Sequence, residues 1–208
     1  MIPRRVFLTG LAASGLTACA AESVLAPMDV VEARAFRSDE PTHLRLLTMR
    51  NTGSDNGAHS AVLVQASQRV MFDPAGSFSH PTIPERNDLL YGITPRVEQY
   101  YISYHARQTY YVEAQYLEVS PAVAEQAFML FQRAGPVAQA NCTRVTSRVL
   151  RQLPGLERLP QTWFPGNLAD AFGKLPGVRT EIYREQDSDD KSLAAQQIDM
   201  QIRADLTR

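Results

Sequence analysis

The run from Ala58 to Gln65 constrains the fold more than any other part of the sequence. It is mostly apolar over eight residues, which is typical of a strand buried in a sheet. Arg69 to Asp73 is apolar again, and Pro74 follows it at once. Two such runs with a short break between them predict an antiparallel hairpin. The chain is therefore expected to be built around a sheet.

Turn and cap signals predict the other elements. Proline after a capping residue favours a helix start, and glycine–proline pairs end helices. Strands are expected at His43–Arg50, Thr109–Val119 and Val178–Tyr183, and helices at 94–105, 120–134, Cys142–Leu153 and Phe164–Phe172. The mixture predicts an α+β fold, with a central antiparallel sheet and helices packed on it.

The first 19 residues indicate export and lipidation. Arg4 and Arg5 supply a positive start, and Val6 to Ala18 is an apolar run too short to span a bilayer. The sequence Leu-Thr-Ala-Cys, ending at Cys19, then resembles a bacterial lipobox, which implies that this cysteine is acylated. Alanine at position 20 favours an outer-membrane anchor that faces the periplasm. A plain cleavable signal peptide is the alternative.

The paired arginines leave the export route open. The run from Pro3 to Thr9 resembles a twin-arginine signal, with the pair followed by Phe7 and Leu8. It has no polar residue before the pair and no lysine after it, so ordinary Sec export also fits.

The rest of the chain divides into three parts. Residues 20–42 are aperiodic and are expected to form a tether, and residues 43–184 to form one α+β domain. Residues 185–208 are polar and are expected to be a solvated tail. No second apolar run is long enough to cross a membrane, so the lipid is the expected membrane link.

Composition and motifs exclude several functions. The formal net charge of −1 provides no basic surface for nucleic acid. The sequence has no Cys-x-x-Cys, no zinc-type spacing, no glycine-rich phosphate loop and no Gly-x-Ser-x-Gly. No cofactor or metal is expected, and a serine hydrolase is disfavoured.

Cys142 is the candidate nucleophile. The chain has two cysteines, so lipidation of Cys19 leaves Cys142 as a lone thiol in an exported protein. It follows Asn141, a good N-cap, at the expected start of a helix, where the helix dipole lowers the pKa of a thiol. The alternative is a small buried hydrophobic residue, because free cysteines are often fully buried.

A cysteine nucleophile needs a base and a group that orients the base. Of the four histidines, His59 is the one within a predicted strand, and Asp73 ends the strand expected to pair with it. His105 is the expected structural histidine, at a helix end where a positive charge favours the helix dipole. His43 and His80 lie at a strand start and in a loop.

This order resembles a known plan. A strand histidine, a polar residue on the neighbouring strand and a cysteine at a helix start are found in that order in circularly permuted papain-like hydrolases, which include permuted NlpC-type peptidases and relatives of lecithin–retinol acyltransferase. The resemblance covers residues 43–183 and implies that Cys142 is the nucleophile, His59 the base and Asp73 the third polar residue. As a whole the chain also resembles bacterial lipoproteins.

The expected function is therefore that of a periplasm-facing cysteine hydrolase or acyltransferase. It would act on an amide or ester bond of an envelope component such as peptidoglycan, with the N–H groups of the helix start binding the oxyanion. The alternative is a non-catalytic envelope lipoprotein with a binding or scaffolding role, in which the tyrosines at 100–116 face a ligand groove.

Overall fold

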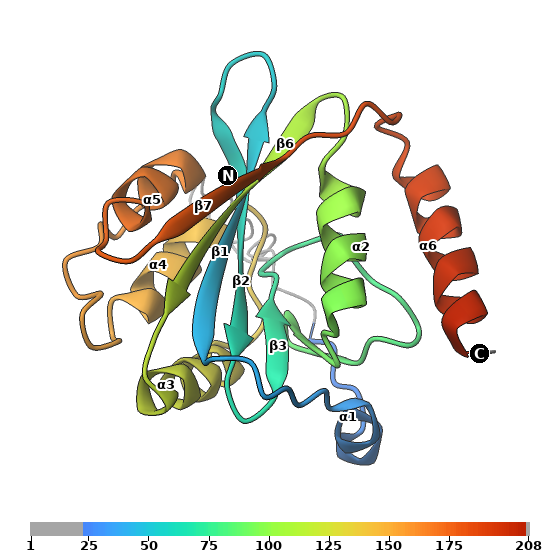
Figure 1. Cartoon of the computed structure of the whole chain (residues 1–208), viewed down its shortest axis with the longest axis horizontal. Helices are drawn as coiled ribbons and strands as arrows, with labels where there is room; N and C mark the ends of the chain where they lie inside the picture. Colours follow the sequence, from blue (N-terminus) through green and yellow to red (C-terminus); the bar gives the residue numbers. More distant parts are fainter. Residues whose placement is uncertain (1–22, 207–208) are drawn as a thin grey trace, which may run out of the picture.

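A computed structural model describes residues 23–206, which form an α+β fold around a seven-stranded antiparallel sheet (Figure 1). The sheet order is β4-β5-β3-β2-β1-β6-β7. The strands are β1 (His43–Asn51), β2 (Gly57–Gln65), β3 (Arg69–Phe72), β4 (Glu85–Arg86), β5 (Leu89–Tyr91), β6 (Tyr110–Glu118) and β7 (Arg179–Tyr183). The helices are α1 (Met28–Arg34), α2 (Pro95–His105), α3 (Pro121–Gln132), α4 (Cys142–Leu150), α5 (Pro165–Phe172) and α6 (Lys191–Leu206).

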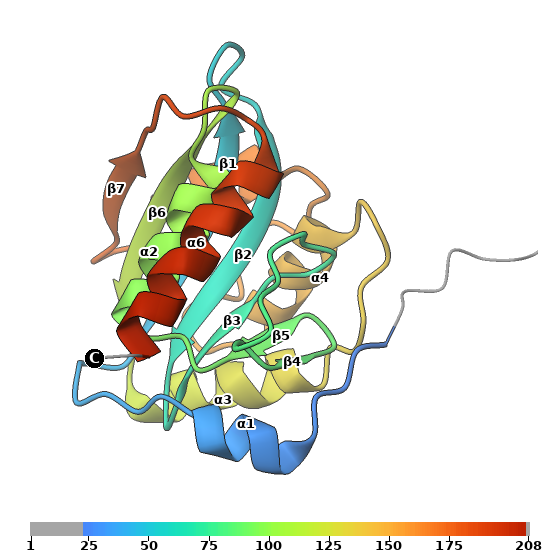
Figure 2. The ribbon, with the colours of Figure 1, turned by 90° about the vertical axis from the view of Figure 1, so that its right-hand side faces the viewer.

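Helices cover both faces of the sheet. Helices α3, α4 and α5 lie on one face, and α2 and α6 on the other (Figures 1 and 2). Alternate residues of the central strands point into the two resulting cores. Val62 and Phe72 pack towards α3, α4 and α5, whereas Leu63 and Met71 pack towards α2 and α6. A double-sided core explains why β2 is apolar along most of its length.

The proline-based helix starts are confirmed. Thr94 Oγ1 accepts a hydrogen bond of 3.1 Å from the backbone N–H of Val97, and Pro95 follows at the first helical position of α2. Ser120 caps α3 in the same way. A proline at this position costs no hydrogen bond, because the first N–H groups of a helix have no partner within it.

One hairpin was not predicted. The proline-rich segment before α2, for which no strand was predicted, contains β4 and β5, and β5 pairs with β3. Asn87 and Asp88 connect them with positive φ angles of 49° and 64°, as a two-residue type I′ turn requires. Strands of two and three residues are too short to produce a recognisable alternation, which explains the omission.

The expected tether is ordered from Ser23 onward. Leu25 forms a β-bridge with Arg86, and the backbone N–H of Ala26 donates to Glu85 O over 2.9 Å. Helix α1 follows and buries Val31 in the core. The division at residue 42 is thus corrected, because a single buried valine on a helix of seven residues leaves no periodic signal.

The expected polar tail also contains a helix. Helix α6 packs along α2 (Figure 2) and buries Ala194, Ile198 and Ile202. These residues recur at four-residue spacing, which places them on one helical face. The polar remainder of the helix masked that stripe in the sequence, so the solvated tail is corrected to a packed element.

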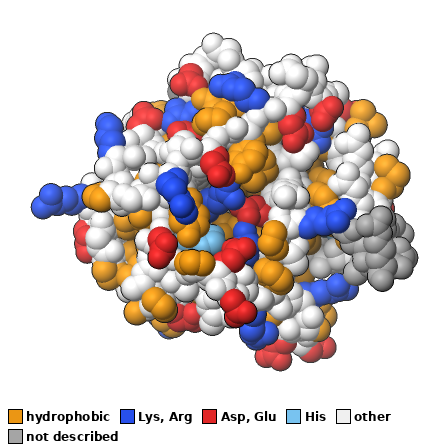
Figure 3. Space-filling view, viewed as in Figure 1, with side chains coloured by type: hydrophobic (Ala, Val, Ile, Leu, Met, Phe, Trp, Pro, Cys, Tyr) orange, Lys and Arg blue, Asp and Glu red, His pale blue; other side chains and the backbone are white. Residues whose placement is uncertain are grey.

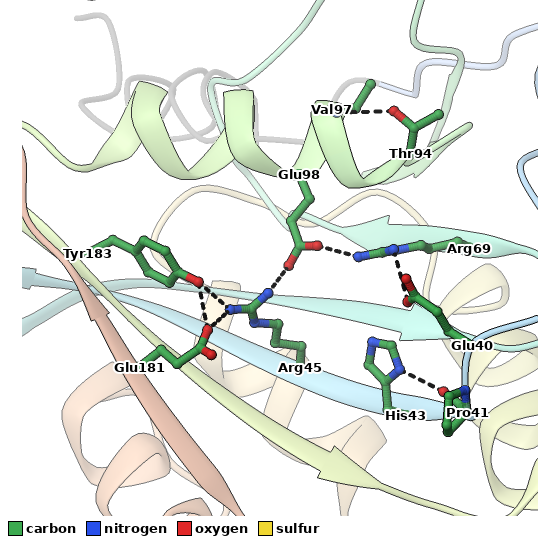
Figure 4. Close-up of polar contacts among 10 residues, drawn as sticks. All are labelled: Glu40, Pro41, His43, Arg45, Arg69, Thr94, Val97, Glu98, Glu181 and Tyr183. Carbon is green, nitrogen blue, oxygen red and sulfur yellow. Dashed lines mark hydrogen bonds and ion pairs between the residues drawn. The ribbon is translucent and has the colours of Figure 1, made fainter. Parts of the chain in front are cut away.

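A buried ionic cluster lies between α2 and the sheet (Figure 4). The Glu98 carboxylate on α2 bridges Arg45 on β1, at 2.6 Å, and Arg69 on β3. Arg45 also contacts Glu181 and Tyr183 on β7. The strand register puts this cluster and His59 at opposite ends of the strands, since Arg45 pairs with Leu63 whereas His59 pairs with Met49. The cluster therefore ties α2 and β7 to the central strands.

The surface carries both signs of charge. Acidic and basic side chains are interspersed over the face shown in Figure 3, with no large area of a single sign. Among residues 23–206, no helix combines the length and the apolar character needed to cross a bilayer.

Candidate active site

Cys142 lies beside the sheet where β3 ends. The pairing of β2 with β3 stops at Val62 and Phe72, so residues 57–61 of β2 have no β3 neighbour. Helix α4 packs on β2 at this edge and brings its first residue there. The Ser60 backbone is near enough to the Cys142 sulfur to help lower the pKa of the thiol. The early end of β3 at Asp73–Pro74 thus opens the edge that the thiol occupies.

Polar neighbours favour the thiolate. Burial by itself raises the pKa of Cys142, but its interaction with His59, together with hydrogen bonds from Thr143 and Ser60, lowers that pKa from 9.0 to about 7. The Thr143 hydroxyl lies 3.7 Å from Sγ and 3.1 Å from the Ser60 hydroxyl. A chain from Ser60 through Thr143 can therefore direct a proton towards the sulfur.

His59 connects the thiol to Asp73. Its Nε2 lies 2.6 Å from Asp73 Oδ1, so this nitrogen donates to the carboxylate and Nδ1 remains for the sulfur. Burial alone lowers the pKa of His59, but the charge and hydrogen bond of Asp73, followed by Cys142, raise it to about 10. The three residues named from the sequence are brought together, and the raised pKa of His59 and lowered pKa of Cys142 both favour the thiolate–imidazolium state.

Asp73 is held as a buried carboxylate. Burial raises its pKa, but the charge and hydrogen bond of His59 outweigh this effect and lower it, with a further contribution from Tyr101. The Tyr101 hydroxyl donates to the same oxygen, Oδ1, over 2.8 Å. Since burial and Asp73 raise the pKa of Tyr101 well above 10, this hydroxyl remains a donor. Helix α2 thus helps His59 to hold the carboxylate in place.

His105 has the structural role expected of it, but its imidazole is neutral. The positive charge expected at this helix end is therefore corrected. Burial lowers its pKa to about 4. Its Nδ1 donates to Tyr101 O over 2.8 Å, and its ring lies 4.4 Å from the Tyr101 ring. A buried site disfavours the imidazolium more than the helix dipole favours it. His105 therefore supports the tyrosine that holds Asp73.

The other two histidines lie away from the thiol. His43 donates from Nδ1 to Pro41 O over 2.8 Å beside the ionic cluster of Figure 4. His80 contacts the Thr82 hydroxyl and lies 3.3 Å from Asp199 of α6. Neither histidine contacts the site formed by Cys142, His59 and Asp73.

Asn141 precedes α4 but does not cap it. Its side chain makes no capping hydrogen bond, and its Oδ1 instead accepts from Arg144 Nη1 over 3.2 Å. The backbone at Asn141, with φ −104° and ψ 5°, is not the extended conformation that a capping side chain requires. The first N–H groups of α4 are consequently not occupied by the cap predicted from the sequence.

A cavity of about 400 Å³ opens beside His59, on the α2 side of the sheet. Its wall includes Gly76, Tyr104, Arg107, Gln139 and Lys191. Gln139 stands three residues before Cys142, so the cavity extends towards the start of α4. Among the described residues, no group of three or more His, Cys, Asp or Glu is placed to hold a metal ion.

Sequence reasoning missed the residues that support the site. Ser60, Thr143 and Tyr101 act through contacts between elements far apart in the chain, and such contacts leave no local pattern. The tyrosines of α2 stood out only as an aromatic group. Gly76 was not singled out from the sequence, although its lack of a side chain makes room for Asp73.

Cys19, the predicted lipidation site, lies outside the described residues. Comparison of the chain with protein-family models, with curated proteins and with solved structures found no match.

Proposed function

We propose that the protein is a cysteine hydrolase or acyltransferase that acts on an amide or ester bond. The observation that carries this proposal is the 2.6 Å hydrogen bond between His59 and a buried Asp73, beside a thiol whose pKa is lowered to about 7. A nucleophile, a base and an orienting group are the minimum set for thiol acyl transfer.

The first half of the reaction forms a thioester. The Cys142 thiolate attacks the substrate carbonyl, and the C–N or C–O bond breaks as the tetrahedral intermediate collapses. The imidazolium of His59 gives its Nδ1 proton to the departing amine or alcohol. Asp73 keeps the ring in place through Nε2 and stabilises its positive charge.

The second half regenerates the thiol. Water, or an acceptor amine, loses a proton to Nδ1 and attacks the thioester carbonyl, which releases the acid or the new amide. The backbone N–H groups at the start of α4 are suited to bind the oxyanion in both halves, because the Asn141 side chain does not occupy them. Positive ends of helix dipoles stabilise such charge.

The order of these residues supports a permuted papain-like arrangement within the α+β fold. His59 on β2 and Asp73 after β3 precede Cys142 at the start of α4. The lipobox at Cys19 supports a protein anchored to the outer membrane and facing the periplasm, so the proposed substrate is an envelope component.

One observation favours a second function. Cys142 is only 8% exposed, as is typical of a small buried residue rather than an accessible nucleophile. In a non-catalytic envelope lipoprotein the same His59–Asp73 pair would stabilise the fold, and the cavity would bind a ligand without cutting it.

A thiol-directed activity probe separates the two functions. A fluorescent epoxide probe applied to membranes that contain the native protein should label Cys142, and Cys142→Ser should abolish the signal. His59→Ala should reduce labelling of the folded protein, whereas both thiol-containing proteins should react equally after denaturation. Labelling that occurs only after denaturation would favour the non-catalytic function.

A further inference from the structure

The cavity beside His59 has two cationic side chains in its wall, Arg107 and Lys191. Arg107 follows α2 and is 6% exposed. Its Nε has no hydrogen-bond partner among the described residues, and its nearest carboxylate, Asp187, lies 3.5 Å from Nη1. This distance is longer than a direct charge-assisted hydrogen bond, so the guanidinium is incompletely paired.

Lys191, the first residue of α6, is held without a carboxylate partner. Its Nζ donates to the Ser77 hydroxyl over 2.8 Å and lies 4.8 Å from the centre of the Tyr104 ring. Among the described residues, no carboxylate is within ion-pair distance of this ammonium group. The hydroxyl and the ring thus position a positive charge on the cavity wall.

The acidic residues nearby offset these charges only in part. Asp189 also borders the cavity and attracts Arg107, but its carboxylate is exposed and is hydrogen-bonded to the Thr109 N–H at 3.0 Å and O–H at 2.6 Å, so solvent screens its charge. The side chain of Asp187 is 64% exposed, so water screens its charge. Arg107 is shielded from water and therefore exerts a stronger field within the cavity.

We propose that this cavity binds a substrate with a free carboxylate, held by Lys191 and Arg107 while the scissile carbonyl lies at Cys142. A volume of about 400 Å³ suits the last one or two residues of a short peptide. The inference rests on the proposed acyl-transfer function and assigns that function a class of substrate, peptides cut near a free carboxyl end. Lys191 and Arg107 are then specificity-determining residues that bind the substrate away from the reacting atoms.

Direct binding tests the site without turnover. In full-length protein carrying Cys142→Ala, calorimetry should detect saturable binding of hippurate. The neutral isostere hippuramide should bind at least tenfold more weakly than hippurate. Adding Lys191→Met should weaken hippurate binding about tenfold and leave hippuramide unchanged. Lys174→Met removes the chain's other lysine, which is exposed on another part of the surface, and should change neither.

Arg107→Lys gives a second measurement that does not depend on Lys191. The substitution keeps the positive charge but loses the planar guanidinium, which can donate two hydrogen bonds to one carboxylate, so hippurate should bind several-fold more weakly. A thermal melt of the variant checks that it is folded. Equal binding of hippurate and hippuramide, or no loss in Lys191→Met, would overturn the proposal. Binding of benzyl phosphate more than tenfold tighter than hippurate would overturn the assignment of a carboxylate.

The two proposals can fail separately. Hippurate selectivity together with a Cys142 that no activity probe labels would retain the anion site and reject the acyl-transfer function. Probe labelling of Cys142 without any preference between hippurate and hippuramide would reject the anion site alone.

Discussion

Gly76 and Asp73 share a space that holds only one side chain. A β-carbon at position 76 would lie 1.8 Å from Asp73 Oδ2, and the backbone N–H of Gly76 donates to Asp73 O over 3.0 Å. The turn after β3 therefore folds back on the carboxylate and closes it against His59 and Tyr101. This contact makes Gly76 a sensitive test of the site.

Gly76→Ala should displace the Asp73 carboxylate. Steric overlap of this size in a packed site costs about 1–3 kcal/mol of unfolding free energy, measured by urea denaturation. Alkylation of Cys142 at pH 7 should slow as well, because His59 loses its orienting partner. Gly53→Ala is the matched control, since its β-carbon would meet its nearest neighbour, Asn51 Oδ1, at an ordinary 3.5 Å. Equal stability of the two variants would contradict the described geometry.

The rate of Cys142 alkylation by iodoacetamide should rise with pH with a midpoint near the thiol pKa of about 7. His59→Ala removes the largest effect that lowers this pKa, so the midpoint should move above 8. The rate at pH 7 should fall about five- to tenfold, because the greater nucleophilicity of a more basic thiolate partly offsets its scarcity.

Asp73→Asn should act in the same direction as His59→Ala but more weakly, because it removes the charge beside the imidazole and retains the ring. Mass spectrometry of the peptide that contains Cys142 measures each rate. A midpoint that does not change in His59→Ala would show that the imidazole does not interact with the thiol.

His105 should make the protein less stable in acid. Its pKa in the folded state, about 4, is below the unfolded value of 6.5, so the unfolded chain takes up the proton first. The stabilisation is complete above pH 6.5 and is lost as the pH falls to about 4. Between pH 7 and 4 the wild type should lose about 3 kcal/mol more unfolding free energy than His105→Gln. Parallel pH profiles of the two proteins would contradict a buried neutral imidazole.

Glu98 should contribute strongly to stability. Glu98→Gln leaves Arg45 and Arg69 with one buried carboxylate fewer, and breaking a buried ion pair costs about 3–5 kcal/mol. Glu118→Gln, on the exposed end of β6, should change the unfolding free energy by less than about 0.5 kcal/mol. Thermal or urea unfolding measures both, and a small effect at Glu98 would show that solvent reaches the cluster.

Cys19 should carry the lipid. Cys19→Ala should be released from sedimented membranes, and its N-terminal peptide should lack the acyl mass found in the wild type. A variant that still sediments with membranes and keeps that mass would rule out this anchor.

Local signals predicted much of the fold, and distant contacts explain what they missed. Apolar runs and turn residues located the strands from His43 to Phe72, and cap residues located the helix starts at Pro95 and Pro121, because those signals depend only on neighbouring residues. His59 and Asp73 could be grouped because a predicted hairpin pairs their strands, and Cys142 joined them as a lone thiol at a predicted helix start. The support from Tyr101, Ser60 and Thr143 could not be predicted, since it depends on the way α2 and α4 pack on opposite faces of the sheet.

The ordered segment at Ser23 would limit the distance between the site and a lipid attached to Cys19. Ser23 is hydrogen-bonded to Asn87, and Leu25 is bridged to Arg86, so the chain joins the folded body only four residues after Cys19. Four residues span at most about 14 Å, whereas a free segment of 23 residues could extend about 80 Å. With a lipid on Cys19, the whole domain would stay close to the bilayer surface. The substrates within its reach would be those that lie within roughly one protein diameter, about 40 Å, beyond that short connection.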